Sequence, residues 1–191
     1  MEDISATPTE QESGELTLVI TNEDFGLEHA ELSEDCRKRY ASRGIVVNPE
    51  NGKIAVIAKK NIHEYKLPGG GKEGDESEEE TFYREIMEET GCEVSIKKKL
   101  GTVIEERTGV NQRQVSNVFV SELIKDTGEL NPTEDEIREG LTIEWMDIDE
   151  AEKAISESFD TVTGDNEEDV YVAHFVIKRD MKILEAYRSV I

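Results

Sequence analysis

Short hydrophobic runs separated by turn residues predict a sheet in this chain. Residues 44–47 and 53–58 are rich in apolar and β-branched side chains. Asn51-Gly52 stands between them, and this dipeptide is the strongest short hairpin signal because it readily adopts the positive φ angles of a tight turn. Further strand-like runs occur before them at residues 16–20 and after them at residues 94–106, 114–123 and 141–148.

Helical spacing of apolar residues predicts the other elements. Phe82, Tyr83, Ile86 and Met87 form an apolar sector of one helix, which stops at Gly91 as its C′ residue. A helix is also expected at residues 33–40, and a polar linker at 163–169 precedes a last helix. The apolar positions of that last helix are Val172, Phe175, Val176, Ile183, Leu184 and Tyr187. Strands before and after an amphipathic helix suggest an α/β fold with a mixed sheet between helices.

The chain divides into three parts by composition. Residues 1–15 are polar, acidic and without periodicity, so a disordered tail is expected there. Residues 16–41 form an extension that packs either on the core or on a second subunit. Residues 42–191 form the core domain, which ends in the C-terminal helix.

The most informative segment lies between Gly70 and Gly91. A helix turns about 100° per residue, so Glu85, Glu88 and Glu89 share one face of the helix that follows the glycines. Three converging carboxylates repel one another unless a cation lies between them. Mg²⁺ or Mn²⁺ fits this need because hard cations take oxygen ligands from carboxylates, water and phosphate. The segment therefore indicates a phosphate-processing site, whereas a solvated acidic face would not explain the glycines and Arg84.

These residues follow the spacing G-x5-E-x7-R-E-U-x-E-E-x-G-U, and the chain resembles the Nudix hydrolases. The matching positions are Gly70, Glu76, Arg84, Glu85, Ile86, Glu88, Glu89 and Gly91. Cys92 replaces the final bulky aliphatic residue and packs as a small hydrophobe. The resemblance implies an α/β/α sandwich with a mixed sheet, in which residues 149–155 look like the short helix that closes such domains. It also implies metal-assisted attack of water on a nucleoside diphosphate that is linked to another group.

The resemblance also implies roles for the residues of the motif. Glu85, Glu88 and Glu89 would be metal ligands, with a backbone carbonyl near Gly69 or Gly70 as a further ligand, and Glu85 could also orient the water. Arg84, paired with Glu76, would fix the carboxylates, although an ordinary surface arginine is the alternative.

The general base and the substrate contacts are less constrained. Nudix enzymes take the base either from the motif or from an outer loop, and the loop 131–140 favours Glu139, then Glu136. The alternative is that the acids of this loop are solvated and have no catalytic role. The same two interpretations apply to Glu105 and Glu106. The glycine loop 69–71 permits close approach of its backbone to a ligand, so Gly69 and Gly71 are expected to bind substrate. Arg43 and Lys66 are expected to contact phosphate, or else are ordinary strand positions.

Charge and cysteine content limit the partners. The formal charge of −23 argues against bulk nucleic acid and membrane surfaces. Two cysteines and no apolar signal segment favour a reduced, cytoplasmic protein without disulfides. A homodimer is compatible with the sequence. The three histidines show no metal-ligand spacing.

The substrate is the least determined feature. The subclass motifs for ADP-ribose, dinucleoside polyphosphates, NADH and coenzyme A are not found at their places in this chain. Nucleoside triphosphates, including oxidised or noncanonical ones, are therefore the leading substrate, and ADP-ribose or a nucleotide sugar is the alternative. A nucleotide sensor without turnover is another, although a sensor needs no complete set of acids. An isoprenoid diphosphate isomerase would require a cysteine and metal-binding histidines that this sequence does not place.

Overall fold

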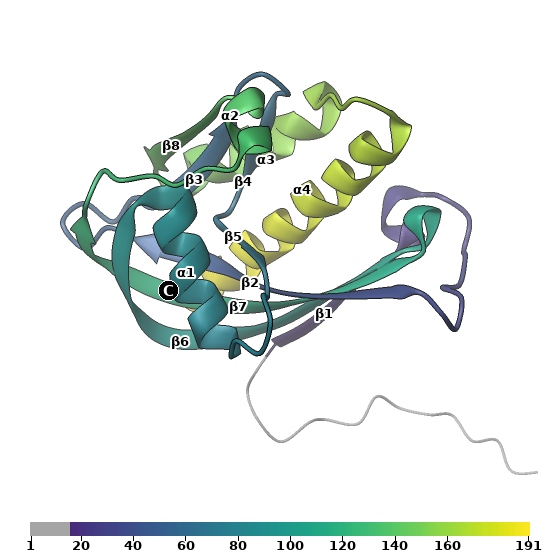
Figure 1. Cartoon of the computed structure of the whole chain (residues 1–191), viewed down its shortest axis with the longest axis horizontal. Helices are drawn as coiled ribbons and strands as arrows, with labels where there is room; N and C mark the ends of the chain where they lie inside the picture. The colour runs from purple at the N-terminus through teal and green to yellow at the C-terminus, as the bar shows by residue number, and fades with distance from the viewer. Residues whose placement is uncertain (1–15) are drawn as a thin grey trace, which may run out of the picture.

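The computed structural model describes residues 16–191, so the tail predicted for residues 1–15 lies outside the described residues. One mixed sheet is built from β1 (Leu16–Ile20), β2 (Arg37–Val47), β3 (Ile54–Lys59), β4 (Glu64–Lys66), β5 (Gly69–Gly71), β6 (Cys92–Arg107), β7 (Gln112–Asp126) and β8 (Leu141–Met146). The helices are α1 (Glu78–Thr90), α2 (Glu134–Glu139), α3 (Ile148–Thr161) and α4 (Glu167–Arg188), as Figure 1 shows.

The strands follow the order β1-β6-β7-β2-β3-β4, while β5 pairs with β2 and β8 pairs with β3. The pairs β1/β6 and β2/β7 are parallel, and the other pairs are antiparallel. The strand at Leu16–Ile20 therefore packs on the sheet of its own chain. Beyond the turn, β2 and β3 pair through Val47 and Ile54, and β2 then continues beside β5 and β7.

Alternate residues of the strands contribute side chains to two hydrophobic cores. Ile45 packs with Phe175 and Leu184 of α4 in one core, whereas Val46 packs with Phe82 of α1 in the other. Successive side chains of a strand point to opposite faces, so helices cover both faces of the sheet. This arrangement is the predicted α/β/α sandwich (Figure 1).

Most of the predicted elements are confirmed. The hairpin turn contains Gly52 at φ 72°, and α1 ends at Gly91 with φ 65°. Ser77 caps the start of α1, because its side chain accepts a hydrogen bond from the Glu80 N–H at 3.1 Å. The strand-like runs after α1 correspond to β6, β7 and β8, and the last two predicted helices correspond to α3 and α4.

The helix predicted at residues 33–40 is wrong, because β2 already begins at Arg37. Residues 37–47 pair in parallel with residues 112–122 of β7, and this long-range pairing outweighs the local helical pattern. The sequence in fact alternates here, since Arg37, Arg39 and Arg43 all line one pocket. That period of two is the strand signal that the helical interpretation overlooked.

Three smaller expectations also need correction. The predicted linker 163–169 is too long by a turn, because α4 begins at Glu167 and Asn166 caps it by accepting from the Asp169 N–H at 3.0 Å. Tyr83 is exposed and does not join the apolar face of α1. The segment 69–71 is not a loop, because its three glycines form β5 against β2, and only Gly69 has a positive φ, of 132°.

Among the described residues, no helix is both long enough and apolar enough to cross a membrane.

Candidate active site

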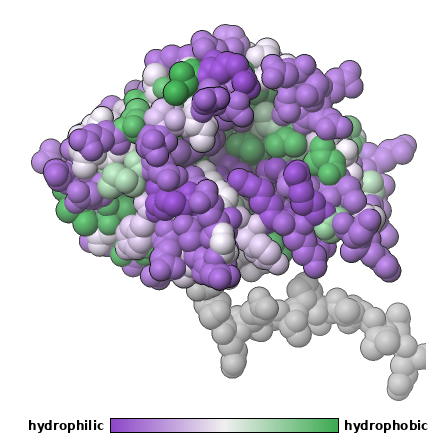
Figure 2. All heavy atoms as spheres, in the orientation of Figure 1, coloured by the Kyte–Doolittle hydropathy of each residue, from purple (hydrophilic) through white to green (hydrophobic). Residues whose placement is uncertain are grey.

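A pocket of about 900 Å³ opens between the sheet, α2 and α4. Figure 2 shows a hollow on this face, with hydrophilic residues around it and apolar residues on part of its wall. Val172, Ala173 and Val176 of α4 supply apolar lining, and most of the remaining lining is charged or polar. This mixture suits a ligand that has both an anionic part and a less polar part.

Arg84 organises the carboxylates at one end of the pocket. Its Nε and Nη2 donate to the two carboxylate oxygens of Glu76 at 2.7 and 3.0 Å. Its Nη1 donates to Glu85 Oε1 at 2.9 Å and to Glu88 Oε2 at 3.0 Å, and Nη2 also donates to the Gly71 carbonyl at 2.8 Å. The bond from Arg84 lowers the pKa of Glu76 to about 2. One guanidinium thus fixes three acids and the glycine strand in a single unit.

Glu89 is held from the opposite side. It is only 4% exposed, and its two oxygens accept from Lys66 Nζ and from the Gly69 N–H, each at 2.7 Å. The side chain of Lys66 is itself 12% exposed, so this is a nearly buried ion pair. The pair brings β4, the glycine strand β5 and the end of α1 to one point.

Gly70 provides the space that Glu85 occupies. A Cβ at position 70 would lie 2.3 Å from Glu85 Oε2, so any larger residue would displace this carboxylate. Burial raises the pKa of Glu85, the nearby Glu89 adds to the rise, and the bond from Arg84 opposes it. The chain therefore leaves the negative charge at Glu85 incompletely neutralised.

The oxygen ligands and the negative charge at the acidic end of the pocket suit a hard divalent cation. Glu76, Glu85, Glu88 and Glu89 face Arg84 and Lys66, so four carboxylates against two cations leave two negative charges. From residue 16 to residue 191, however, no three His, Cys, Asp or Glu side chains already converge on one metal position. The reason is visible in the contacts, because Arg84 and Lys66 take up the carboxylate oxygens. A cation would have to compete with these hydrogen bonds.

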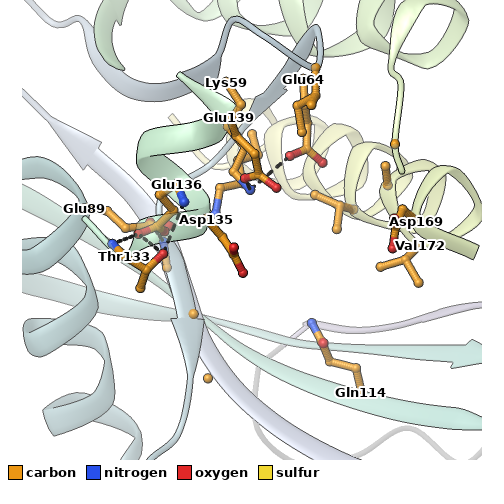
Figure 3. Close-up of a pocket in the computed structure, with 18 of the residues that line it drawn as sticks. Lys59, Glu64, Glu89, Gln114, Thr133, Asp135, Glu136, Glu139, Asp169 and Val172 are labelled. Carbon is orange, nitrogen blue, oxygen red and sulfur yellow. Dashed lines mark hydrogen bonds and ion pairs between the residues drawn. The ribbon is translucent and has the colours of Figure 1, made fainter. Parts of the chain in front are cut away.

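A second charged group lies across the pocket. Lys59 Nζ is 2.6 Å from Glu139 Oε2 and 3.6 Å from Glu64 Oε2. Burial lowers the pKa of Lys59, but Glu64 and Glu139 outweigh burial, and the net effect is a raised pKa. Figure 3 shows Glu139, Lys59 and Glu64 together at one side of the cavity.

Arginines occupy the remaining end of the pocket. Arg43 lines it as expected, and its Nε donates to Ser116 Oγ at 3.2 Å. Arg107 of β6 and Arg179 of α4 lie in the same lining, together with the exposed Arg37 and Arg39. The sequence interpretation missed these four arginines and the buried Glu64. Alternation along β2, from Arg37 to Arg39 and on to Arg43, was the available signal, but Arg179 lies on a helix and no local pattern marks it.

The structure brings the predicted site residues together at this pocket. Its lining includes Arg43, Lys66, Gly69, Gly70, Gly71, Glu85, Glu89, Glu136 and Glu139. Arg84, Glu76 and Glu88 join through the hydrogen bonds of Arg84. Among the predicted alternatives, Glu105 is fully buried beneath the arginines, whereas Glu106 is paired with Arg113 at 2.5 Å.

Comparisons with known proteins agree with this geometry. The family model described as the NUDIX domain matches residues 38–163. A putative 8-oxo-dGTP diphosphatase of Bacillus subtilis (strain 168) is 37% identical over 57 residues, which are 30% of this chain and 38% of that protein. A MutT-like protein of Streptomyces ambofaciens is 29% identical over 116 residues, which are 61% of this chain and 68% of that protein. The match with the Bacillus protein thus spans well under half of its length.

A solved structure supports the fold. A NUDIX hydrolase from Nitrosomonas europaea superposes with a TM-score of 0.58 at 15% identity, covering 80% of this chain and 90% of that chain. At this identity the likeness concerns the architecture alone.

Proposed function

Because the chain belongs to the Nudix domain family, we propose that it is a metal-dependent pyrophosphohydrolase that cleaves a diphosphate linkage in a nucleotide-type substrate. One observation carries the proposal: a single pocket joins the carboxylates organised by Arg84 to a set of lysines and arginines. An acidic end suits a cation, a basic end suits phosphate, and a diphosphate needs both. The favoured substrate is a nucleoside triphosphate, oxidised and noncanonical ones included.

Glu85, Glu88, Glu89 and the Gly70 carbonyl would hold Mg²⁺ or Mn²⁺. Members of this family generally use divalent metal ions. When bound, such an ion supplies positive charge that neutralises phosphate oxygens. Arg84 keeps Glu85 and Glu88 in place through its bonds of 2.9 and 3.0 Å. The bonds to Glu76 fix Arg84 in turn, so Glu76 and Arg84 are positioning residues.

Glu139 is the proposed general base. Its carboxylate would take a proton from the attacking water, whose oxygen bonds to phosphorus while the bridging P–O bond breaks. Each product then keeps part of the original diphosphate. Lys59, 2.6 Å from Glu139, holds the carboxylate toward the cavity. Lys66 and Arg43 would contact the phosphates, and Gly69 and Gly71 let the substrate approach the backbone.

Product analysis tests this proposal. Nucleoside triphosphates, 8-oxo-dGTP, ADP-ribose and nucleotide sugars would be incubated with the protein and Mg²⁺ or Mn²⁺, and the products separated by chromatography. We expect a nucleoside monophosphate and pyrophosphate from a triphosphate, and no products when the divalent ions are chelated. Binding without products would indicate a sensor, and cleavage that persists in excess chelator would contradict the metal requirement. A homodimer and a cytoplasmic location stay predictions, and light scattering of the purified chain tests the former.

A further inference from the structure

Three nearly inaccessible arginines form the end of the pocket away from the Arg84 carboxylates. Arg43 of β2, Arg107 of β6 and Arg179 of α4 are 3%, 4% and 1% exposed, and all three line the cavity. We call them the arginine cluster. Arginine is rarely buried unless it is paired, so the partners of these three side chains determine what the cluster can do.

The chain leaves part of the hydrogen-bonding capacity of the cluster unused. Arg107 Nε and Arg179 Nη2 are buried, and neither has a hydrogen-bond partner within the described residues. Each such orphaned group costs about 1–3 kcal/mol if nothing satisfies it. These two N–H donors lie on side chains that border the cavity, where a ligand oxygen could accept from them.

The charge of the cluster is also incompletely balanced. The carboxylates that form ion pairs with it are Glu105, 2.6 Å from Arg107 Nη2, and Asp180, 2.7 Å from Arg179 Nε. The buried Glu64 also acts on Arg179 but is itself paired with Lys59 at 3.6 Å. Asp180 also accepts from the Leu67 N–H at 2.8 Å. Three guanidiniums against two carboxylates leave one positive charge, in a chain whose formal charge is −23. Burial lowers the pKa of Arg43 to about 9, and repulsion from Arg179 contributes.

The cluster lies directly beside the proposed catalytic end. Arg43 pairs with Gly69 across β2 and β5, and the N–H of Gly69 donates to Glu89 at 2.7 Å. Neighbouring strands are about 5 Å apart, so the two ends of the pocket begin one strand apart at this point. A short run of linked phosphates can therefore contact both ends at once.

We propose that the arginine cluster is an anion subsite that binds a phosphoryl group of the substrate beyond the linkage that is cleaved. Guanidinium groups suit this role because their planar N–H forks match phosphate oxygens in pairs. The inference rests on the proposed function for the identity of the substrate. It favours nucleotides with three or more linked phosphates over diphosphates that end in a neutral sugar.

Phosphate binding tests the subsite without any turnover. The whole chain in EDTA would be titrated with inorganic phosphate, by calorimetry and by melting temperature, against chloride at the same ionic strength. We expect phosphate to raise the melting temperature of the wild type, because a ligand that binds only the folded state stabilises it. Arg43→Gln and Arg179→Lys should weaken phosphate binding about 10- to 100-fold, the worth of one lost charge-assisted hydrogen bond.

The matched control is Arg113→Gln. Arg113 lies on β7 between two residues of the pocket lining, Gln112 and Gln114, but its side chain pairs with Glu106 and does not line the cavity. This change removes the same charge and should leave phosphate affinity at the wild-type value. Arg107→Lys replaces Arg179→Lys if circular dichroism shows that the latter is not folded. Equal affinity in all variants, or no phosphate effect on the wild type, would overturn the subsite.

A substrate comparison separates this inference from the proposed function. We expect Arg43→Gln to lower the ratio of kcat/KM for a nucleoside triphosphate to that for ADP-ribose by about tenfold or more. Equal losses on both substrates would mean that the cluster acts on the cleaved linkage itself, which contradicts a subsite beyond it. If the wild type cleaves neither substrate, the proposed function fails, and the phosphate titration still decides whether the subsite exists.

Discussion

The backbone N–H of Gly69 donates to Glu89 Oε2 at 2.7 Å, and this bond ties the glycine strand to the last turn of α1. Gly69 has a φ of 132°, and a Cβ there would lie 2.4 Å from the Cα of Arg43. Only glycine fits this position without strain. This bond joins two residues that are twenty positions apart in the sequence, so the spacing between the glycines and the helix acids fixes a buried contact in the fold.

Glu89→Gln should abolish most of the turnover. Glutamine keeps the size and can still accept from Gly69, but it removes the charge that a hard cation requires and that Lys66 neutralises. We expect a loss of more than about 100-fold, above the usual effect of a supporting residue. Steady-state kinetics with Mn²⁺ titration measures it. Glu79→Gln, an exposed change on the same helix, is the control, and comparable turnover in the two variants would refute the metal role.

Arg84→Ala should lower kcat more than it raises KM. The guanidinium contacts three carboxylates and the Gly71 carbonyl, so we infer that it positions the acids and does not hold substrate. Loss of such support commonly costs about 10–100-fold. Arg84→Lys should recover little, because a single ammonium cannot reproduce this fork. A change confined to KM would instead place Arg84 among the substrate contacts.

The grouping of the motif acids on one helix is predictable from the sequence because its determinants are local. Glu85, Glu88 and Glu89 lie on one helix, and helical geometry alone places them on neighbouring positions of one face. The arginine cluster is different. Arg43, Arg107 and Arg179 lie on β2, β6 and α4, which are far apart in sequence. The pairing of β2 with β7, the pairing of β7 with β6 and the docking of α4 bring them together.

The same difference between local and long-range information explains why the helix predicted at residues 33–40 is wrong. That prediction rests on local sequence alone, whereas β2 is stabilised by pairing with β7, more than seventy residues away. Local propensity gives no access to that pairing. The hairpin at Asn51-Gly52 was predictable because its determinants adjoin it, and Gly52 indeed has a φ of 72°.

Glu105→Gln should destabilise the protein and make its free energy of unfolding less dependent on pH in the acidic range. Burial raises the pKa of Glu105, but Arg179, Arg107 and Arg43 outweigh burial, and the folded-state pKa lies below the ordinary value. A carboxylate with a lowered folded pKa contributes stability that is fully present above its unfolded pKa of about 4.3 and is lost as pH falls through the folded value.

Urea denaturation at pH 7 and at pH 3 measures this effect. We expect Glu105→Gln to lower the free energy of unfolding at pH 7 by about 3–5 kcal/mol, since it leaves buried arginines without their partner. The difference between the two pH values should also shrink. Glu106→Gln, which breaks a more exposed pair with Arg113, should cost less than about 1 kcal/mol. Similar losses in the two variants would contradict the buried role of Glu105.

Gly70→Ala should reduce turnover by displacing Glu85. The backbone at Gly70 has no positive φ, so alanine introduces no backbone strain, yet its Cβ would lie 2.3 Å from Glu85 Oε2. The bond from Arg84 to Glu85 would then be lost, and we expect turnover to fall about 10–100-fold. At Gly71 the nearest atom is the end of the Arg39 side chain at 2.9 Å, which can move aside. Gly71→Ala is therefore the control, and its kcat should exceed that of Gly70→Ala.

Glu139→Gln tests the source of the general base. If this carboxylate accepts the proton of the attacking water, the change should leave metal affinity nearly unaltered and lower kcat by roughly 10²–10⁴-fold. The acidic limb of the pH–rate profile should disappear as well, because that limb would report the ionisation of Glu139. Lys59 would lose its partner at 2.6 Å, so a folding check by circular dichroism accompanies the kinetics.

Two further changes on α2 distinguish catalysis from charge. Glu134→Gln removes the same charge at an exposed position outside the pocket lining and should leave kcat near the wild-type value. Glu136 lines the pocket but also accepts from the Thr133 N–H at 2.8 Å, so Glu136→Gln tests the other acid that the loop offers. A large loss at Glu136 alone would move the base to that residue. Equal, small effects at all three positions would mean that α2 supplies no base, and Glu85, the motif carboxylate that Arg84 holds, would take that role.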